Sequence, residues 1–415
     1  PSRARVGPAT LEQFCGTAIE ATVVDASART LTMFTVIDAP RRLANVEEEL
    51  LAVGPHGQAE ELAALFDCWG LLDHCAMPTD AVKSYTCLEF VGPKAQLAIA
   101  EAMTQISTIR TMSALKLPPR GGATRVPLRG DAPAELIVIG SGSLGFDEAW
   151  TVLIPGTQGG ESTEAAIRAL RAAIQRAGGV DGTVAESRHC GAPHSKAKLW
   201  EVLRVLRGRP ALRAEFGREP MACVHEELTT TASLTNSASD DAFPSPLELG
   251  LWSSVQLDLD KGAYVGHDVV SRMANVLHKS RELLGILYEG PAPFLSKVIA
   301  TRDGLTISDD APIGAVFGEE RHVYACGASD ADVASKACGE LTSLVSFGAE
   351  GAFGLAMIET SSKLNLGARV RVQGPGAEGG AVGTLVPLAF ASCTGVPDAL
   401  TGSSWAVLSR APALT

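Results

Sequence analysis

A lysine precedes a glycine-bracketed turn that contains a tyrosine, in the sequence Lys261-Gly262-Ala263-Tyr264-Val265-Gly266. Lys261 brings a compact cation that can pair with a carboxylate, and Tyr264 brings an aromatic face. Gly262 and Gly266 allow backbone angles and close approaches that other residues resist, so the turn presents Tyr264. A structural interpretation is also open: Lys261 pairs with a surface carboxylate, and Tyr264 fills a gap between a strand and a helix.

Two elements of different periodicity position this turn. Before it, apolar residues alternate with polar ones from Val255 to Leu259, which predicts a half-buried strand. After it, apolar residues recur at helical spacing from His267 onward, and Asp268 lies where the helix dipole favours a negative charge. The pattern predicts a strand, a turn and a helix.

Other candidate sites are weaker. The sequence Gly140-Ser-Gly-Ser-Leu-Gly145 matches the G-x-G-x-x-G pattern of dinucleotide-binding turns, but strand-like residues follow it, so we predict a hairpin loop. Neither Cys68, His74 and Cys75 nor His189, Cys190 and His194 have the paired C-x-x-C spacing of a structural metal site. We therefore predict no metal site, and we expect Cys87 to be a core residue.

Composition limits the class of protein. The chain has 415 residues, 46% of them hydrophobic, which is enough for two or three domains with substantial cores. Its net charge of -12 argues against nucleic-acid binding, and no apolar run approaches the about 20 residues that span a bilayer. Nine scattered cysteines and the lack of an Asn-x-Ser/Thr sequon favour a reducing compartment.

The first half of the chain mixes strands and helices. Residues 17–24 and 30–37 read as a hairpin, and residues 136–139 and 149–154 as paired strands. We expect helices at the positions that have helical spacing, namely 45–53, 58–66, 95–103, 163–177 and 199–207, the last capped by Gly208.

The second half becomes rich in glycine and short β-type runs after Gly290, such as Arg369–Val372 and Val382–Val386. A small closed sheet is the natural way to protect such strands. The run from Thr229 to Asp241 lacks periodicity, so we expect a loop.

The turn around Lys261 resembles the signature K-G-C-Y-x-G-Q-E of the YgfZ-type folate-binding proteins, relatives of the glycine cleavage T-protein (aminomethyltransferase). The preceding PLELGLW is most similar to their plastid branch. Ala263, His267 and Asp268 stand where that family carries Cys, Gln and Glu. Further similar segments follow the same order along the chain, namely YTCLEFVGPK (85–94), Trp200 with LRVLRGRP (203–210), GELTS (339–343) and FGLAMIE (353–359).

The resemblance implies a fold and a ligand. We expect a multi-domain α+β protein, with a folate-binding T-protein-like core over residues 1–280 and a C-terminal β-barrel over 281–415. Insertions are expected at 229–243 and near 314–338. Tetrahydrofolate would be the cofactor, with Lys261 at its glutamate tail and Tyr264 at its pterin. Glu20 matches an acidic position of relatives, although it also reads as a strand residue that faces water.

The replacement of the signature cysteine by Ala263 removes any thiol-dependent step, so we predict no catalytic residue. Two functions remain open. One is a non-catalytic structural subunit or assembly factor of an organellar protein complex, soluble or peripheral to a membrane complex, with a chloroplast favoured over a mitochondrion. The other is a tetrahydrofolate-binding factor for iron–sulfur cluster assembly or repair in a plastid or mitochondrion.

Overall fold

The computed structural model describes residues 16–38, 50–54, 85–108, 117–129, 135–140, 148–155, 161–177, 203–211, 214–216, 244–251, 264–275, 279–288, 298–301, 304–307, 322–327, 333–346, 352–373 and 380–388. The chain divides into two compact units. The first contains Pro1–Glu20 and Phe34–Glu186, and the second contains Ala21–Met33 and Ser187–Thr415.

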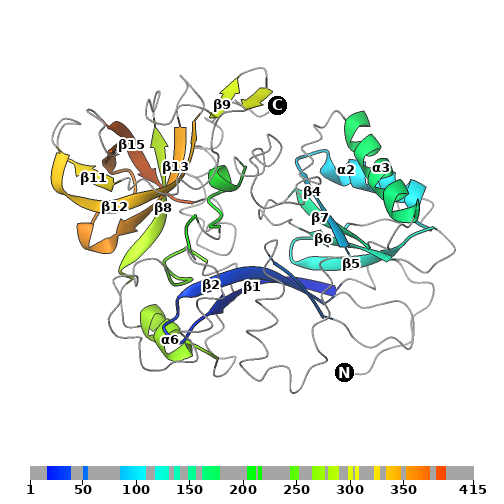
Figure 1. The fold of residues 1–415 in the computed structure, drawn as a ribbon, viewed down its shortest axis with the longest axis horizontal. Helices are drawn as coiled ribbons and strands as arrows, with labels where there is room; N and C mark the ends of the chain where they lie inside the picture. The colour runs from blue at the N-terminus through cyan, green and yellow to red at the C-terminus, as the bar shows by residue number, and fades with distance from the viewer. Residues whose placement is uncertain are drawn as a thin grey trace. The chain divides into compact units, whose positions relative to one another are not determined.

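A seven-stranded sheet is the main element of the first unit (Figure 1). Its order is β3-β2-β1-β5-β6-β7-β4, and every strand pair for which a register is known is antiparallel. The strands are β1 (Gly16–Val24), β2 (Thr30–Asp38), β3 (Leu50–Val53), β4 (Tyr85–Val91), β5 (Gly122–Pro127), β6 (Glu135–Gly140) and β7 (Ala149–Pro155).

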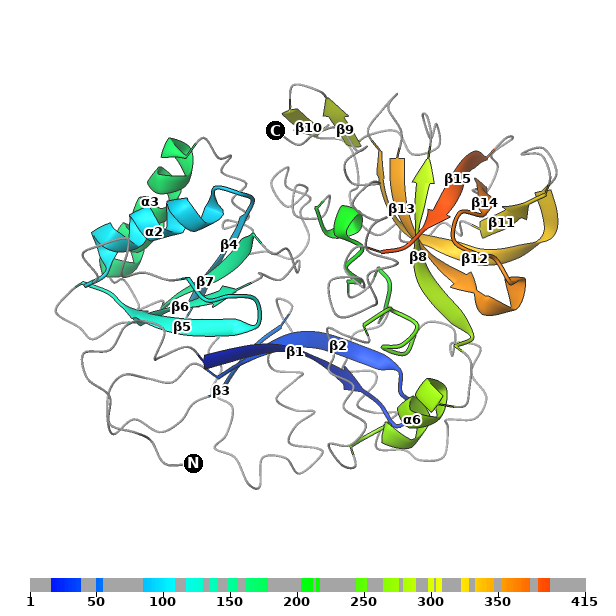
Figure 2. The same cartoon turned by 180° about the vertical axis from the view of Figure 1, so that it is seen from behind.

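Two helices, α2 (Ala95–Ile106) and α3 (Glu161–Arg176), pack side by side against one face of this sheet (Figures 1 and 2). They bury a core that includes Ile99 and Met103 of α2 and Leu170 of α3. The opposite face of the sheet has its own apolar cluster around Ile37, Ile137 and Leu153. The sheet is therefore apolar on both faces.

A closed six-stranded barrel is the main element of the second unit. Its order is β11-β12-β13-β8-β15-β14, and β14 pairs with β11 to close it. The strands are β8 (Arg281–Tyr288), β11 (His322–Cys326), β12 (Val333–Ser346), β13 (Ala352–Glu359), β14 (Arg369–Gln373) and β15 (Ala381–Val386). The smaller elements are α6 (His267–Asn275), a hairpin of β9 (Val298–Thr301) and β10 (Gly304–Ile307), and the 3-10 turn η8 (Thr360–Ser362).

One apolar core of the second unit contains barrel residues together with residues from segments that are distant from the barrel strands in sequence. Met33 of strand β2 packs with Val205 and Leu206. Leu249 and Leu251 join the same core, together with barrel residues such as Leu355.

Most strand and helix predictions are confirmed. The hairpin of β1 and β2, helices α2 and α3, the pair of β6 and β7, and strands β14 and β15 all form where periodicity predicted them. The antiparallel pairing of β6 with β7 also excludes a dinucleotide-binding turn after Gly140, because that turn needs a crossover to a parallel strand. The α+β class and the closed barrel are confirmed as well.

Two predictions are wrong. Residues 50–53 form β3 and not the end of a helix, because Leu51 is buried between exposed Leu50 and Ala52, an alternation with the period of a strand. Cys87 is exposed and not a core residue, because β4 buries its other face through Phe90. The expected helix at 58–66 and the loop at 229–243 lie outside the described residues.

The domain boundary at residue 280 stays a prediction, although β8 starts at Arg281. Within the expected insertion at 314–338, residues 322–326 and 333–338 are barrel strands. Among the described helices, none combines the length and apolar composition that crossing a bilayer requires.

Candidate functional site

The predicted binding turn is described from Tyr264 onward, and Lys261, Gly262 and Ala263 lie outside the described residues. Tyr264 is half-buried, its phenol oxygen is shielded from solvent, and burial raises the pKa of the phenol. Its ring centroid lies 4.9 Å from that of His267, with the planes tilted by 55°. The His267 backbone N–H donates to the Tyr264 carbonyl oxygen at 3.0 Å. One side of the tyrosine ring is thus occupied by the imidazole.

Gly266 is required at this turn for two reasons. Its φ of +78° lies in the left-handed region, and a Cβ at this position would lie 2.4 Å from the backbone oxygen of Asp25. Its own carbonyl accepts the N–H groups of Val269 at 3.1 Å and Val270 at 3.0 Å, which starts helix α6. Gly266 therefore fixes where the helix begins and lets the turn touch the β1–β2 hairpin.

The support beneath Gly266 is the turn between β1 and β2. Asp25 Oδ1 accepts the N–H groups of Ser27 at 2.9 Å and Arg29 at 2.8 Å, and Asp25 Oδ2 pairs with the Arg29 guanidinium at 2.5 Å. The Asp25 carboxylate is buried, and Ala28 next to it has a φ of 62°. This ion-paired turn lies directly against Gly266 and supports the turn that Tyr264–Gly266 form.

Glu20 lies on β1 and is half-buried, with its Oε1 shielded from solvent. The neighbouring Ile19 is 44% exposed, so the solvent-facing side of β1 belongs to Ile19. Glu20 thus lies on the opposite side of β1 from Ile19, and both interpretations of Glu20 stay predictions.

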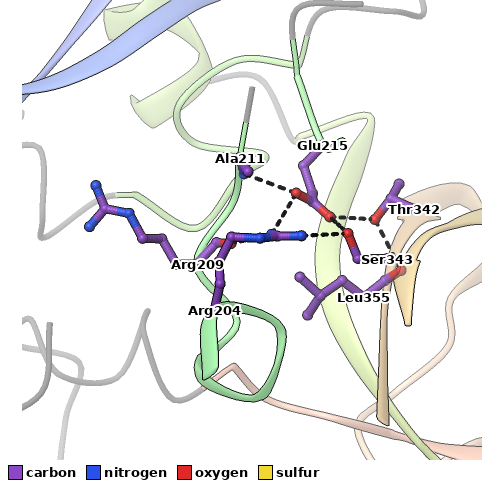
Figure 3. A network of polar contacts seen from close by, with 7 residues as sticks. All are labelled: Arg204, Arg209, Ala211, Glu215, Thr342, Ser343 and Leu355. Carbon is purple, nitrogen blue, oxygen red and sulfur yellow. Dashed lines mark hydrogen bonds and ion pairs between the residues drawn. The ribbon is translucent and has the colours of Figure 1, made fainter. Parts of the chain in front are cut away.

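A buried polar network that the sequence did not predict lies in the second unit (Figure 3). Arg204 and Glu215 form an ion pair at 2.9 Å, and both side chains are fully buried. Arg204 also donates to the Arg209 carbonyl at 2.7 Å and to the Ser343 hydroxyl at 2.8 Å. The Ser343 hydroxyl in turn donates to Glu215 Oε1.

The same carboxylate ties two further positions to the network. The Ala211 N–H donates to Glu215 Oε2 at 2.9 Å. The Thr342 hydroxyl lies 3.0 Å from both Glu215 Oε1 and the Leu355 carbonyl, so it can donate its proton to either. Both buried charged groups are thus ion-paired and hydrogen-bonded, and these contacts offset the free-energy cost of removing the charges from water.

The network joins three of the segments that carry the family resemblance, namely 203–210, 339–343 and 353–359. A fourth, PLELGLW, adds Leu249 and Leu251 to the adjacent core, and its Glu248 carboxylate accepts the Ser280 hydroxyl at 2.5 Å. The paired polar side chains of these segments are buried, so they stabilise the interior of this unit. One signal was present in the sequence: Arg204 interrupts an apolar helical run, where a charge needs a partner.

Within the described ranges, no three His, Cys, Asp or Glu side chains converge as a metal site. The cysteines and histidines considered above for metal binding lie outside those ranges.

Comparison with known proteins identifies the fold of this chain through a solved structure. No protein-family model and no curated protein matches this sequence. Among solved structures, the glycine cleavage system aminomethyltransferase T from Bartonella henselae superposes with a TM-score of 0.53 and 13% identity, covering 90% of this chain and 76% of that chain. At this identity the likeness concerns architecture alone. The chain has the fold of an aminomethyltransferase T.

Proposed function

We propose that this protein uses the aminomethyltransferase T fold in a non-catalytic role, as a structural subunit or assembly factor of an organellar protein complex. One observation carries the proposal: the YgfZ-type signature that the turn resembles has alanine, Ala263, where that family has cysteine. Alanine can act neither as nucleophile nor as redox group nor as metal ligand.

The geometry of the turn supports this proposal. Gly266 is explained by its contact with Asp25, and Tyr264 by its packing against His267 with a shielded phenol oxygen. A protein that no longer binds folate would still need Gly266 and Tyr264 for folding. The surroundings of Tyr264 therefore favour a packing role over a role as an exposed ring on which a pterin could stack.

Calorimetric titration of the purified chain with 5-formyltetrahydrofolate tests the proposal first. We expect no saturable heat from a chain whose circular dichroism and cooperative melting show that it is folded. The second measurement is the native size of a tagged chain in chloroplast extract, where we expect it to migrate well above 43.2 kDa. A folded chain that migrates as a monomer and shows no role in any assembly would overturn the proposal.

The second candidate is a tetrahydrofolate-binding factor for iron–sulfur cluster assembly or repair. It is favoured by Glu20, whose Oε1 is shielded from solvent as a ligand-binding carboxylate would be, and by the firm support under the turn. Saturable binding that Lys261→Ala and Tyr264→Phe each weaken at least about tenfold would select this candidate. Loss of iron–sulfur enzyme activities in cells without the protein would support it.

A further inference from the structure

The outer surface of the barrel carries a basic and aromatic strip on two paired strands. Tyr324 of β11 lies directly opposite Arg371 of β14, and His322 lies opposite Gln373. Directly opposite residues share a face, and so do residues two apart, which adds Arg369 to this side. Val323, Val370 and Val372 alternate with them and are fully buried, so the strip faces outward.

The arginines of this strip are positively charged, whereas the chain as a whole carries a net negative charge. Arg369 and Arg371 bring two guanidinium groups two residues apart, in a protein whose net charge is -12. Among the residues that the structure describes, the carboxylate of Glu340 lies beside the strip, because Glu340 is paired with His322 across β11 and β12. Within this described part of the barrel, the positive charge of the strip comes from β14.

The side chains are held close to the barrel. His322, Tyr324, Arg369 and Arg371 are each half-buried, and the Nε of Arg371 is shielded from solvent. Arg369 donates to the Thr384 hydroxyl at 3.4 Å, and the rings of His322 and Tyr324 meet edge to face at 6.3 Å. Side chains held in this way lose little conformational entropy on binding.

We propose that the strip of Arg369, Arg371, Tyr324 and His322 is a docking surface for an acidic segment of a partner protein. Planar guanidinium groups pair with carboxylates through two parallel hydrogen bonds, and arginine and tyrosine dominate binding energy at protein interfaces. The barrel is closed, so its strands have no open edge to which a partner could add a strand. Contact here has to be made by side chains.

This inference rests on the proposed function as a complex subunit and names one of its contact surfaces. The test replaces both arginines by glutamate, Arg369→Glu with Arg371→Glu. The matched control is Lys363→Glu, which also reverses an exposed positive charge of the barrel unit, outside the strip. Circular dichroism and thermal melting establish that each variant is folded.

Binding is measured with a fluorescein-labelled glutamate-rich peptide by anisotropy at low and physiological salt. We expect the double variant to bind at least about tenfold more weakly than the wild type and the control to bind as the wild type does. Equal affinity of all three chains, or no binding by the wild type at low salt, would overturn the inference. Competition by inorganic phosphate as strong as that by the peptide would assign the strip to phosphate groups, and would also overturn it.

The same variants in chloroplast extract separate the two proposals. If the wild type and the control migrate in a large assembly and the double variant does not, the strip is the contact. If all three migrate in the assembly, the docking surface is refuted and the subunit role stands. If the wild type itself is monomeric, the subunit role fails independently of peptide binding.

Discussion

At the scale of single residues, Gly266 combines a left-handed φ with a close approach to a backbone atom. Replacing it by alanine would place a Cβ 2.4 Å from the Asp25 carbonyl oxygen and force alanine into a left-handed conformation. We expect Gly266→Ala to lower the free energy of unfolding by about 2 to 4 kcal/mol, measured by urea denaturation.

Gly367 provides the control for this prediction. It has a φ of +88°, but a Cβ there would meet no atom within 4 Å. Gly367→Ala should therefore show the conformational penalty alone, about 1 kcal/mol. Equal losses in the two variants would mean that the contact with Asp25 contributes nothing.

Cys338 gives a prediction for pH dependence. Its thiol is buried in the barrel, 3.1 Å from the Val323 carbonyl oxygen, and burial raises its pKa from 9.0 to about 11. Between these values the unfolded chain loses the proton while the folded chain keeps it, so stability is present below pH 9 and is lost as pH rises toward 11. We expect Cys338→Ala to reduce this alkaline loss, measured by urea denaturation at pH 8 and pH 10.5.

Cys326→Ala is the control for the pH prediction, because it removes a half-buried thiol from the neighbouring strand. An alkaline loss in Cys338→Ala as steep as that of the wild type would show that the Cys338 thiol has no part in it.

At the scale of elements, the buried pair of Arg204 and Glu215 links the helical turn at 203–207 to strand β12 through the hydroxyls of Thr342 and Ser343. Glu215→Gln leaves Arg204 buried with its charge uncompensated, so we expect a loss of about 3 to 5 kcal/mol in the free energy of unfolding. Arg204→Met with Glu215→Leu removes both charges and should recover much of that loss. Urea denaturation of the single and double variants measures the difference.

The surface pair Lys336–Glu359 is the matched control. Its atoms lie 3.7 Å apart, and the lysine side chain is 84% exposed. Water screens such a pair, so we expect Lys336→Met to change stability by less than about 1 kcal/mol. Comparable losses at the two pairs would refute the importance given to burial.

Local pattern predicted the elements better than it predicted their contacts. The hairpin of β1 and β2 and helix α3 are encoded by periodicity within a few residues, so the sequence predicts them. The partnership of Arg204 with Ser343 joins residues 139 apart, and nothing local encodes it. For the turn before α6, the sequence predicted the helix from His267 but not the close approach of Gly266 to Asp25.

At the scale of the whole molecule, the β1–β2 hairpin belongs to both compact units, because residues 21–33 count with the second and the strand ends with the first. Residues Ser187–Thr415 alone would lack Met33 in their core and the Thr30 N–H that donates to the Pro244 carbonyl at 3.0 Å. We expect this fragment to melt about 5 to 10 °C or more below the full chain, measured by circular dichroism.

The full chain carrying Met33→Ala isolates one part of that effect. It should melt between the fragment and the wild type, since a buried methionine contributes about 2 to 3 kcal/mol. A fragment that melts as the full chain does would show that the hairpin is dispensable to the second unit.

Closure of the barrel also has a consequence for biosynthesis. Strand β8 pairs with β13 and β15, and β15 starts 93 residues after β8 ends, the difference between Ala381 and Tyr288. At ribosomal speeds of about 5 to 20 residues per second, β8 waits on the order of 5 to 20 s for the strand that covers its last open edge. During translation, the nascent chain exposes a hydrogen-bonding edge that the finished protein never shows.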